Sequence, residues 1–140
     1  NPLDLKKFIK YSLLNQSTPI VGYSKIKSEK QYLSKSIPKI IFNNKKHLMY
    51  ISRSPVPMSK NFIFNQSHKQ VCIYSFPKKY LNYYGVLKNK TLLENIEDIE
   101  ILRLLENGVK VKVFKLSDKS IAVDTLKDVK LVELYLKNNI

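Results

Sequence analysis

The sequence predicts an α/β fold, with a mostly parallel sheet, flanking helices and one inserted β-hairpin. Short apolar runs typical of strands alternate along the chain with segments whose apolar residues recur at helical spacing. The 140 residues are 44% hydrophobic and 26% charged, which is the composition of a globular domain. No apolar run approaches the roughly 18 residues that cross a membrane. We therefore expect one domain, or part of one, with no membrane partner.

The chain opens with a helix signal. Asn1 is suited to be an N-cap, Pro2 fits the first helical position, and apolar residues at helical spacing continue over residues 3–14. Because a helix capped by residue 1 and lacking an initiator Met is an unusual natural start, we expect sequence upstream of this chain and an α/β fold that is incomplete at its N-terminus.

The remaining elements follow from apolar runs and the residues that interrupt them. Two strand-like runs, 39–42 and 48–51, flank the polar segment 43–46, and this pattern predicts the hairpin. Gly108 follows the clearest helical pattern, where a glycine commonly ends a helix. The other predicted elements are strand 19–23, strand 71–74, helix 78–84, helix 92–107, strand 109–113, strand 121–123 and a helix from Thr125 to about 137.

Charge and cysteine content limit the choice of partner and compartment. Lys+Arg 25 against Asp+Glu 11 gives a net charge of +14, which suggests either an anionic partner or a solvated basic surface. Only Arg53 and Arg103 are arginines, and arginine is the side chain that reads bases and phosphates best. We therefore favour the solvated surface and no nucleic-acid partner. The single cysteine, Cys72, rules out an internal disulfide and favours a cytoplasmic location.

Four side chains are candidates for chemistry. Asp124 follows a predicted strand and precedes a helix, where a carboxylate is suited either to ligate Mg²⁺ or simply to support the helix cap. Arg53 ends a strand before a proline-rich loop, as a clamp for a carboxylate or phosphate or as a surface ion pair. Tyr74 offers a hydroxyl from a strand, although a packed core tyrosine is the favoured interpretation. Glu100 has apolar neighbours along the chain and is a stronger candidate for a functional site than Glu94 and Glu97, for which a solvated acidic face is favoured.

Four segments in the same order and spacing resemble one family, the cytidylyltransferases that activate 3-deoxy-manno-octulosonate and related acidic sugars. The resemblance covers residues 39–137 well and 1–38 loosely. The matches are YISRSPVP at 50–57 to YFSRAPIP, QVCIYSF at 70–76 to H-x-G-I-Y-x-Y, LENIEDIEILR at 93–103 to L-E-x-x-E-x-L-E-Q-L-R, and AVDTLKD at 122–128 to V-D-T-P-E-D.

The resemblance implies a Rossmann-like fold of the nucleotide-diphospho-sugar transferase type and a reaction of CTP with a sugar acid. The products are a CMP-sugar, used for surface polysaccharides such as lipopolysaccharide or capsule, and pyrophosphate. It implies Mg²⁺ as cofactor, Asp124 as one of two Mg²⁺-ligating aspartates, and a sugar-acid pocket lined by Arg53, Gln70, Tyr74 and Glu100. It also implies a homodimer paired near the hairpin.

Two departures and one absence qualify the resemblance. Gln70 stands where the family has a pocket His, and Ile101 where it has a pocket Gln, so the preferred sugar is expected to differ from the standard octulosonate. No phosphate loop or Gly-Asp-Glu-Pro block is present. Residues 1–140 are therefore expected to be the C-terminal, sugar-acid-binding and dimerisation part of the domain, without the nucleotide-binding half and inactive alone. Two alternatives stay open: a basic module that binds RNA or phosphate, and an inactive remnant that serves as an interaction domain.

Overall fold

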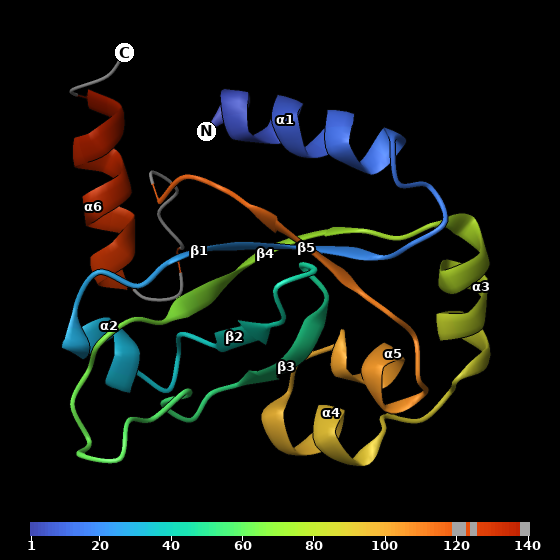
Figure 1. Ribbon diagram of the computed structural model, residues 1–140. Helices are drawn as coiled ribbons and strands as arrows, with labels where there is room; N and C mark the ends of the chain where they lie inside the picture. Colours follow the sequence, from blue (N-terminus) through green and yellow to red (C-terminus); the bar gives the residue numbers. More distant parts are fainter. Residues whose placement is uncertain (119–122, 124–125, 138–140) are drawn as a thin grey trace.

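A five-stranded sheet forms the centre of the molecule in the computed structural model, which describes residues 1–118, 123 and 126–137 (Figure 1). The strands lie in the order β3-β2-β4-β1-β5. Their bounds are β1 Ile20–Lys25, β2 Lys39–Phe42, β3 Leu48–Ser52, β4 His68–Ser75 and β5 Lys112–Lys115.

The α/β class is confirmed, but the sheet is mixed rather than mostly parallel. Among the described strands only β1 and β5 pair in parallel. β4 runs antiparallel to both β1 and β2, and the predicted hairpin makes β2 antiparallel to β3. Apolar runs indicate where strands lie but not their direction, which is set by how each connection returns the chain to the sheet.

Six helices surround the sheet in the described part of the chain. They are α1 Pro2–Leu13, α2 Glu29–Leu33, α3 Lys78–Val86, α4 Leu92–Glu97, α5 Leu102–Glu106 and α6 Leu126–Lys137. The start of α1 is as predicted, because the Asn1 side chain accepts a hydrogen bond of 3.0 Å from the Leu3 N–H and Pro2 is the first helical residue. No helix within the described ranges is long and apolar enough to cross a membrane.

The helix predicted over 92–107 is two helices, α4 and α5. Asp98 adopts a left-handed conformation with φ 52° and ends α4, since a residue in this conformation cannot continue a right-handed helix. The residues after the break, Ile99 and Ile101, are buried in the core. Gly108 has φ +73° after α5, as its place in the sequence predicted.

The sheet is covered on both faces. α1 crosses one face, while α4 and α5 lie together against the other beside β3 (Figure 1). Phe8 of α1 packs with Ile20 and Leu116, and the larger core cluster joins β1, β2 and β3 to the segment 99–104. The fold therefore fixes 99–104 rigidly against the sheet. The predicted strand 121–123 lies, except for Val123, outside the described residues, as does the predicted cap Thr125.

Candidate functional site

The side chain of Arg53, just beyond β3, is held by main-chain carbonyl groups. Its Nε donates to the Glu97 carbonyl at 2.6 Å, and its terminal nitrogens donate to the carbonyls of Lys35 at 3.2 Å and Asp98 at 3.3 Å. No carboxylate of the described residues forms an ion pair with it. The guanidinium is thus fixed in place with no direct ion pair to a carboxylate of the described residues, which suits an anion clamp better than a surface ion pair.

Gln70, Tyr74 and Glu100 form a hydrogen-bonded chain. The Gln70 side-chain amide donates to the Tyr74 hydroxyl, which in turn donates to the Glu100 carboxylate at 3.4 Å. Burial and the charge of Glu100 raise the pKa of Tyr74, so its hydroxyl stays protonated at neutral pH. Tyr74 also packs against the core cluster. It is therefore both a packed tyrosine and a hydroxyl donor beside an exposed carboxylate.

Arg53 and the Gln70–Tyr74–Glu100 chain are both connected to one short segment. Residues 97–100 contribute the Glu97 and Asp98 carbonyls that bind Arg53 and the Glu100 carboxylate that binds Tyr74. Ile101, which replaces a polar residue of the resembled family, is fully buried in the core. The segment that follows α4 thus contacts the Arg53 guanidinium through main-chain carbonyls and the Tyr74 hydroxyl through the Glu100 side chain. These side chains can bind a molecule with a carboxylate and several hydroxyl groups.

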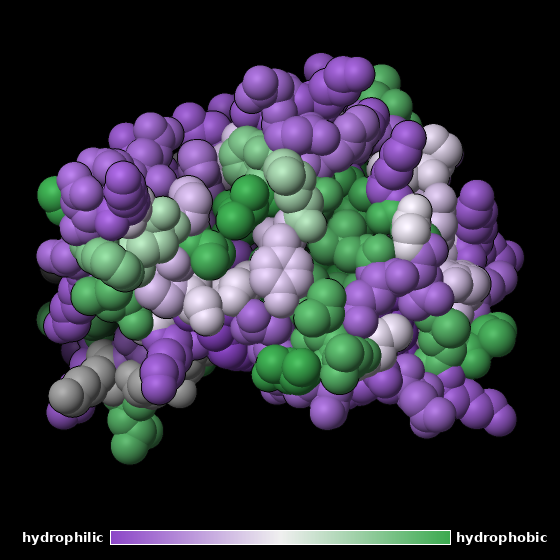
Figure 2. All heavy atoms as spheres, turned by 60° about the horizontal axis from the view of Figure 1, so that its bottom comes forward, coloured by the Kyte–Doolittle hydropathy of each residue, from purple (hydrophilic) through white to green (hydrophobic). Residues whose placement is uncertain are grey.

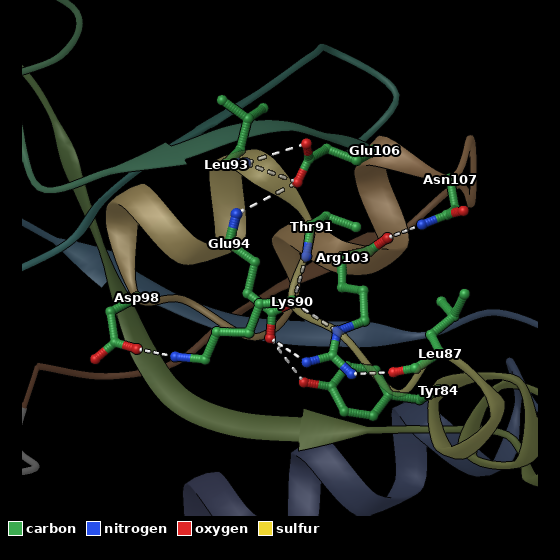
Figure 3. Close-up of polar contacts among 10 residues, drawn as sticks. All are labelled: Tyr84, Leu87, Lys90, Thr91, Leu93, Glu94, Asp98, Arg103, Glu106 and Asn107. Atoms are coloured by element: carbon green, nitrogen blue, oxygen red, sulfur yellow. Dashed lines mark hydrogen bonds and ion pairs between the residues drawn. The ribbon is translucent and has the colours of Figure 1, made fainter.

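Glu94 and Glu97 do not form the solvated acidic face that was favoured for them. Glu94 is 1% exposed and makes a bidentate ion pair with Arg103, at 2.5 and 2.7 Å (Figure 3). The Tyr84 hydroxyl and the Thr91 N–H also donate to this carboxylate. Burial alone would raise the pKa of Glu94, but its hydrogen bonds from Arg103, Tyr84 and Thr91 outweigh burial and lower it.

A cluster of contacts around this ion pair joins α3, α4 and α5. Arg103 also donates to the Leu87 carbonyl at 2.8 Å, and its guanidinium lies 4.1 Å from the centre of the Tyr84 ring. Glu106 accepts hydrogen bonds from the first N–H groups of α4, and Lys90 pairs with Asp98 at 2.6 Å (Figure 3). This cluster fixes the position of α4 and hence of the candidate site.

Lys39 is a residue that sequence reasoning missed. It lies in β2, is fully buried, and donates from Nζ to the carbonyls of Arg53 at 2.5 Å and Ser34 at 2.8 Å. Burial lowers its pKa, which the charge of Arg53 lowers further and that of Glu97 opposes. The available signal was its position at the start of the apolar run 39–42, directly after a proline.

The structure does not test the prediction that Asp124 binds magnesium. Asp124 lies among the residues that are not described. Within the ranges 1–118 and 126–137, no three His, Cys, Asp or Glu side chains are grouped so as to hold a metal ion. Asp124 as a metal ligand therefore stays a prediction.

Surface hollows lie away from these side chains. One, of about 310 Å³, is lined by residues of β2 and of the segment 57–68, and a smaller one by residues 57–66. Figure 2 shows apolar areas between the hydrophilic ones on the face that is turned forward from the bottom of Figure 1.

Comparison with known proteins identifies relatives of one kind. The 3-deoxy-manno-octulosonate cytidylyltransferase of Thermodesulfovibrio yellowstonii is 32% identical over 119 residues, covering 80% of this chain and 46% of the relative. The mitochondrial enzyme of that name from Arabidopsis thaliana is 34% identical over 71% of this chain and 35% of its own length. The 8-amino-3,8-dideoxy-manno-octulosonate cytidylyltransferase of Shewanella baltica is 32% identical over 70% of this chain and 40% of its own length. No protein-family model matches.

The fold agrees with a solved structure of CMP:2-keto-3-deoxy-manno-octonic acid synthetase complexed with CTP. The TM-score is 0.89 at 23% identity, over 100% of this chain and 58% of the other. The nucleotidyltransferase-like α/β fold is thereby confirmed. The chain spans less than half the length of the curated relatives it matches. The resemblance seen in the sequence is confirmed: this chain is related to part of the 3-deoxy-manno-octulosonate cytidylyltransferases.

Proposed function

We propose that this chain is the sugar-acid-binding part of a cytidylyltransferase that couples CTP to an acidic eight-carbon sugar. The observation that supports this most strongly is the grouping of Arg53 with the Gln70–Tyr74–Glu100 chain around residues 97–100. The family resemblance of the sequence implies the same four residues for the sugar-acid pocket. Relatives whose names specify this reaction support the same conclusion.

The side chains divide the recognition of such a sugar between its charge and its hydroxyl groups. The Arg53 guanidinium, whose partners among the described residues are carbonyl oxygens, attracts the sugar carboxylate through charge-assisted hydrogen bonds. Glu100 accepts from sugar hydroxyls, and the Tyr74 and Gln70 chain fixes the position of its carboxylate. The anomeric hydroxyl then attacks the α-phosphate of CTP, the bond to the β-phosphate oxygen breaks, and pyrophosphate leaves.

The remaining parts of the reaction belong to groups beyond the described residues. We propose that Asp124 and a second carboxylate outside this chain hold Mg²⁺, which would neutralise charge developing on the phosphates. The nucleotide-binding half, a homodimer paired near the hairpin and a cytoplasmic location complete the proposal. Residues 1–140 alone are then inactive, because they lack the CTP phosphate site.

The sugar itself is proposed to differ from the standard octulosonate. Gln70 and Ile101 replace two groups that would hydrogen-bond that sugar, and a site rejects analogues chiefly through polar groups left unpaired. A relative named for an 8-amino sugar shows that such substrates occur among similar proteins. A related acidic or amino sugar is therefore the favoured substrate class.

Two measurements test the proposal. The coding sequence upstream of residue 1 is read for an in-frame phosphate loop and Gly-Asp-Glu-Pro block, and the protein it encodes is assayed with CTP, Mg²⁺ and a panel of sugar acids. We expect pyrophosphate release and a CMP-sugar, with an amino sugar preferred over the octulosonate. Micromolar CTP binding with turnover by residues 1–140 alone would contradict the assignment of the two halves, and absence of turnover with every sugar acid would refute the activity.

A further inference from the structure

The main chain of Arg53 is held on both sides by charged groups, the buried Lys39 and the half-buried Glu97. Its carbonyl oxygen accepts from the Lys39 Nζ at 2.5 Å, and its N–H donates to the Glu97 carboxylate at 2.8 Å. Glu97 also accepts from the Ser52 hydroxyl at 2.6 Å and the Tyr50 hydroxyl at 3.3 Å. The strand end that carries Arg53 is therefore fixed by groups from β2 and α4.

The guanidinium retains donors after these contacts. A guanidinium has five N–H groups. Three are used, one on Nε and one on each terminal nitrogen, by the carbonyls of residues 35, 97 and 98. Among the described residues, no partner takes the second N–H of either terminal nitrogen, and two N–H groups are the number that a carboxylate needs for two parallel hydrogen bonds.

We propose that Lys39 and Glu97 are positioning residues that hold Arg53 so that its two remaining N–H groups bind the carboxylate of the sugar acid. This inference rests on the proposed function, because that function supplies the carboxylate. Lys39 acts on the Arg53 carbonyl, and Glu97 acts on the Arg53 N–H while its own carbonyl binds Nε. Neither side chain touches the sugar.

The burial of Lys39 favours this role over simple packing. An ammonium group removed from water is costly unless it is bonded, and an apolar side chain would fill the same space in β2 without that cost. The Lys39 ammonium group donates to two main-chain carbonyls of the described residues, and one of them belongs to Arg53. An aliphatic residue would leave that carbonyl unpaired and the strand end free to shift, and a shift of about 1 Å at a recognition group can cost about a hundredfold in efficiency.

Calorimetric titration of the chain with 3-deoxy-manno-octulosonate and its 8-amino analogue tests the inference, with a neutral sugar lacking the carboxylate as the control ligand. We expect Lys39→Met and Glu97→Ala to weaken the affinity for both sugar acids about tenfold, or about 1.4 kcal/mol. Glu97→Gln, which keeps an acceptor oxygen, should lose much less. Lys69→Met removes the same charge from the residue that pairs with Lys39 across β2 and β4 and should stay within about twofold of wild type.

The ¹⁵N–¹H signal of the Arg53 Nε provides a second readout. This signal should shift on titration with sugar acid in the wild type, and it should shift much less in Lys39→Met. The corresponding Nε signal of Arg103 should not shift. Equal affinities for the wild type, Lys39→Met and Glu97→Ala would overturn the inference, as would a wild type that binds no sugar acid. If Lys39→Met does not fold, the comparison of Glu97→Ala with Glu97→Gln decides. These are binding measurements, so failure of the positioning inference is distinguishable from failure of the proposed function. The variants can bind sugar acid as the wild type does while turnover is still observed, and the variants can lose affinity while no turnover is observed.

Discussion

Replacing Arg103 with Met tests the most buried ion pair in the described part of the chain. The change leaves the Glu94 carboxylate, which is 1% exposed, without the bidentate partner at 2.5 and 2.7 Å. Breaking a buried ion pair from one side typically costs roughly 3–5 kcal/mol. Glu94 keeps its hydrogen bonds from Tyr84 and Thr91. We therefore expect the lower end, a loss of about 3 kcal/mol in the free energy of unfolding.

Urea unfolding followed by circular dichroism at pH 7 measures this loss, with an unchanged slope against denaturant as the sign that the folded state stays compact. The double variant Glu94→Gln/Arg103→Met removes the buried charge as well, so it should be more stable than Arg103→Met alone. Below about pH 5 the single variant should approach the wild type, because an unpaired buried carboxylate has a raised pKa and is already protonated there. A loss under about 1 kcal/mol, or a double variant no more stable than the single one, would refute the reasoning.

Three further predictions concern other parts of the molecule. Gly108→Ala places a side chain at φ +73° with free space around it and should cost about 1 kcal/mol of stability, whereas Gly85→Ala, inside α3 and equally unobstructed, should gain about 0.5 kcal/mol; thermal unfolding of both variants checks the contrast of sign. Tyr74→Phe removes the hydroxyl between Gln70 and Glu100 and should weaken sugar-acid binding by about 1 kcal/mol, measured by calorimetry, with no change expected if that hydroxyl has no part in the site. In the wild type the pKa of Glu94 is lower in the folded than in the unfolded protein, so its contribution to stability is present above the ordinary carboxyl pKa and is lost as the pH falls through the lower folded value. The unfolding free energy should therefore depend more steeply on pH across this window in the wild type than in Glu94→Gln. Equal pH dependence in the two proteins would contradict the assignment.

Local signals in the sequence predicted most of the secondary structure. The cap at Asn1, the hairpin around 43–46 and the glycine after α5 depend on neighbouring residues, and each is where the sequence placed it. The break at Asp98 could not be predicted in this way, because 92–107 has a helical pattern throughout. The left-handed residue is supported by contacts between elements far apart in sequence, such as the bond from Arg53 to the Asp98 carbonyl.

In the candidate site, too, some residues could be predicted from local sequence and others could not. Arg53, Tyr74, Gln70 and Glu100 were found from motifs, and the structure connects the last three by hydrogen bonds. Lys39 and Glu97 were not, since a lysine in a strand and a glutamate on a helix are ordinarily solvated. The burial of Lys39 and the partial burial of Glu97 depend on the packing of β2 and α4, which no single segment of sequence encodes.

The shortness of α4 has a consequence for evolution of this protein. A helix of six residues is too short to be stable alone and depends on its surroundings. The two arginines of the chain hold it from opposite ends, Arg103 through Glu94 and Arg53 through the carbonyl of Glu97. A substitution that loosens either attachment therefore displaces the other. The position of Arg53, and with it the proposed ligand preference, then cannot change independently of thermal stability. Natural variants that alter one of these arginines are expected to carry a compensating change in the same six residues.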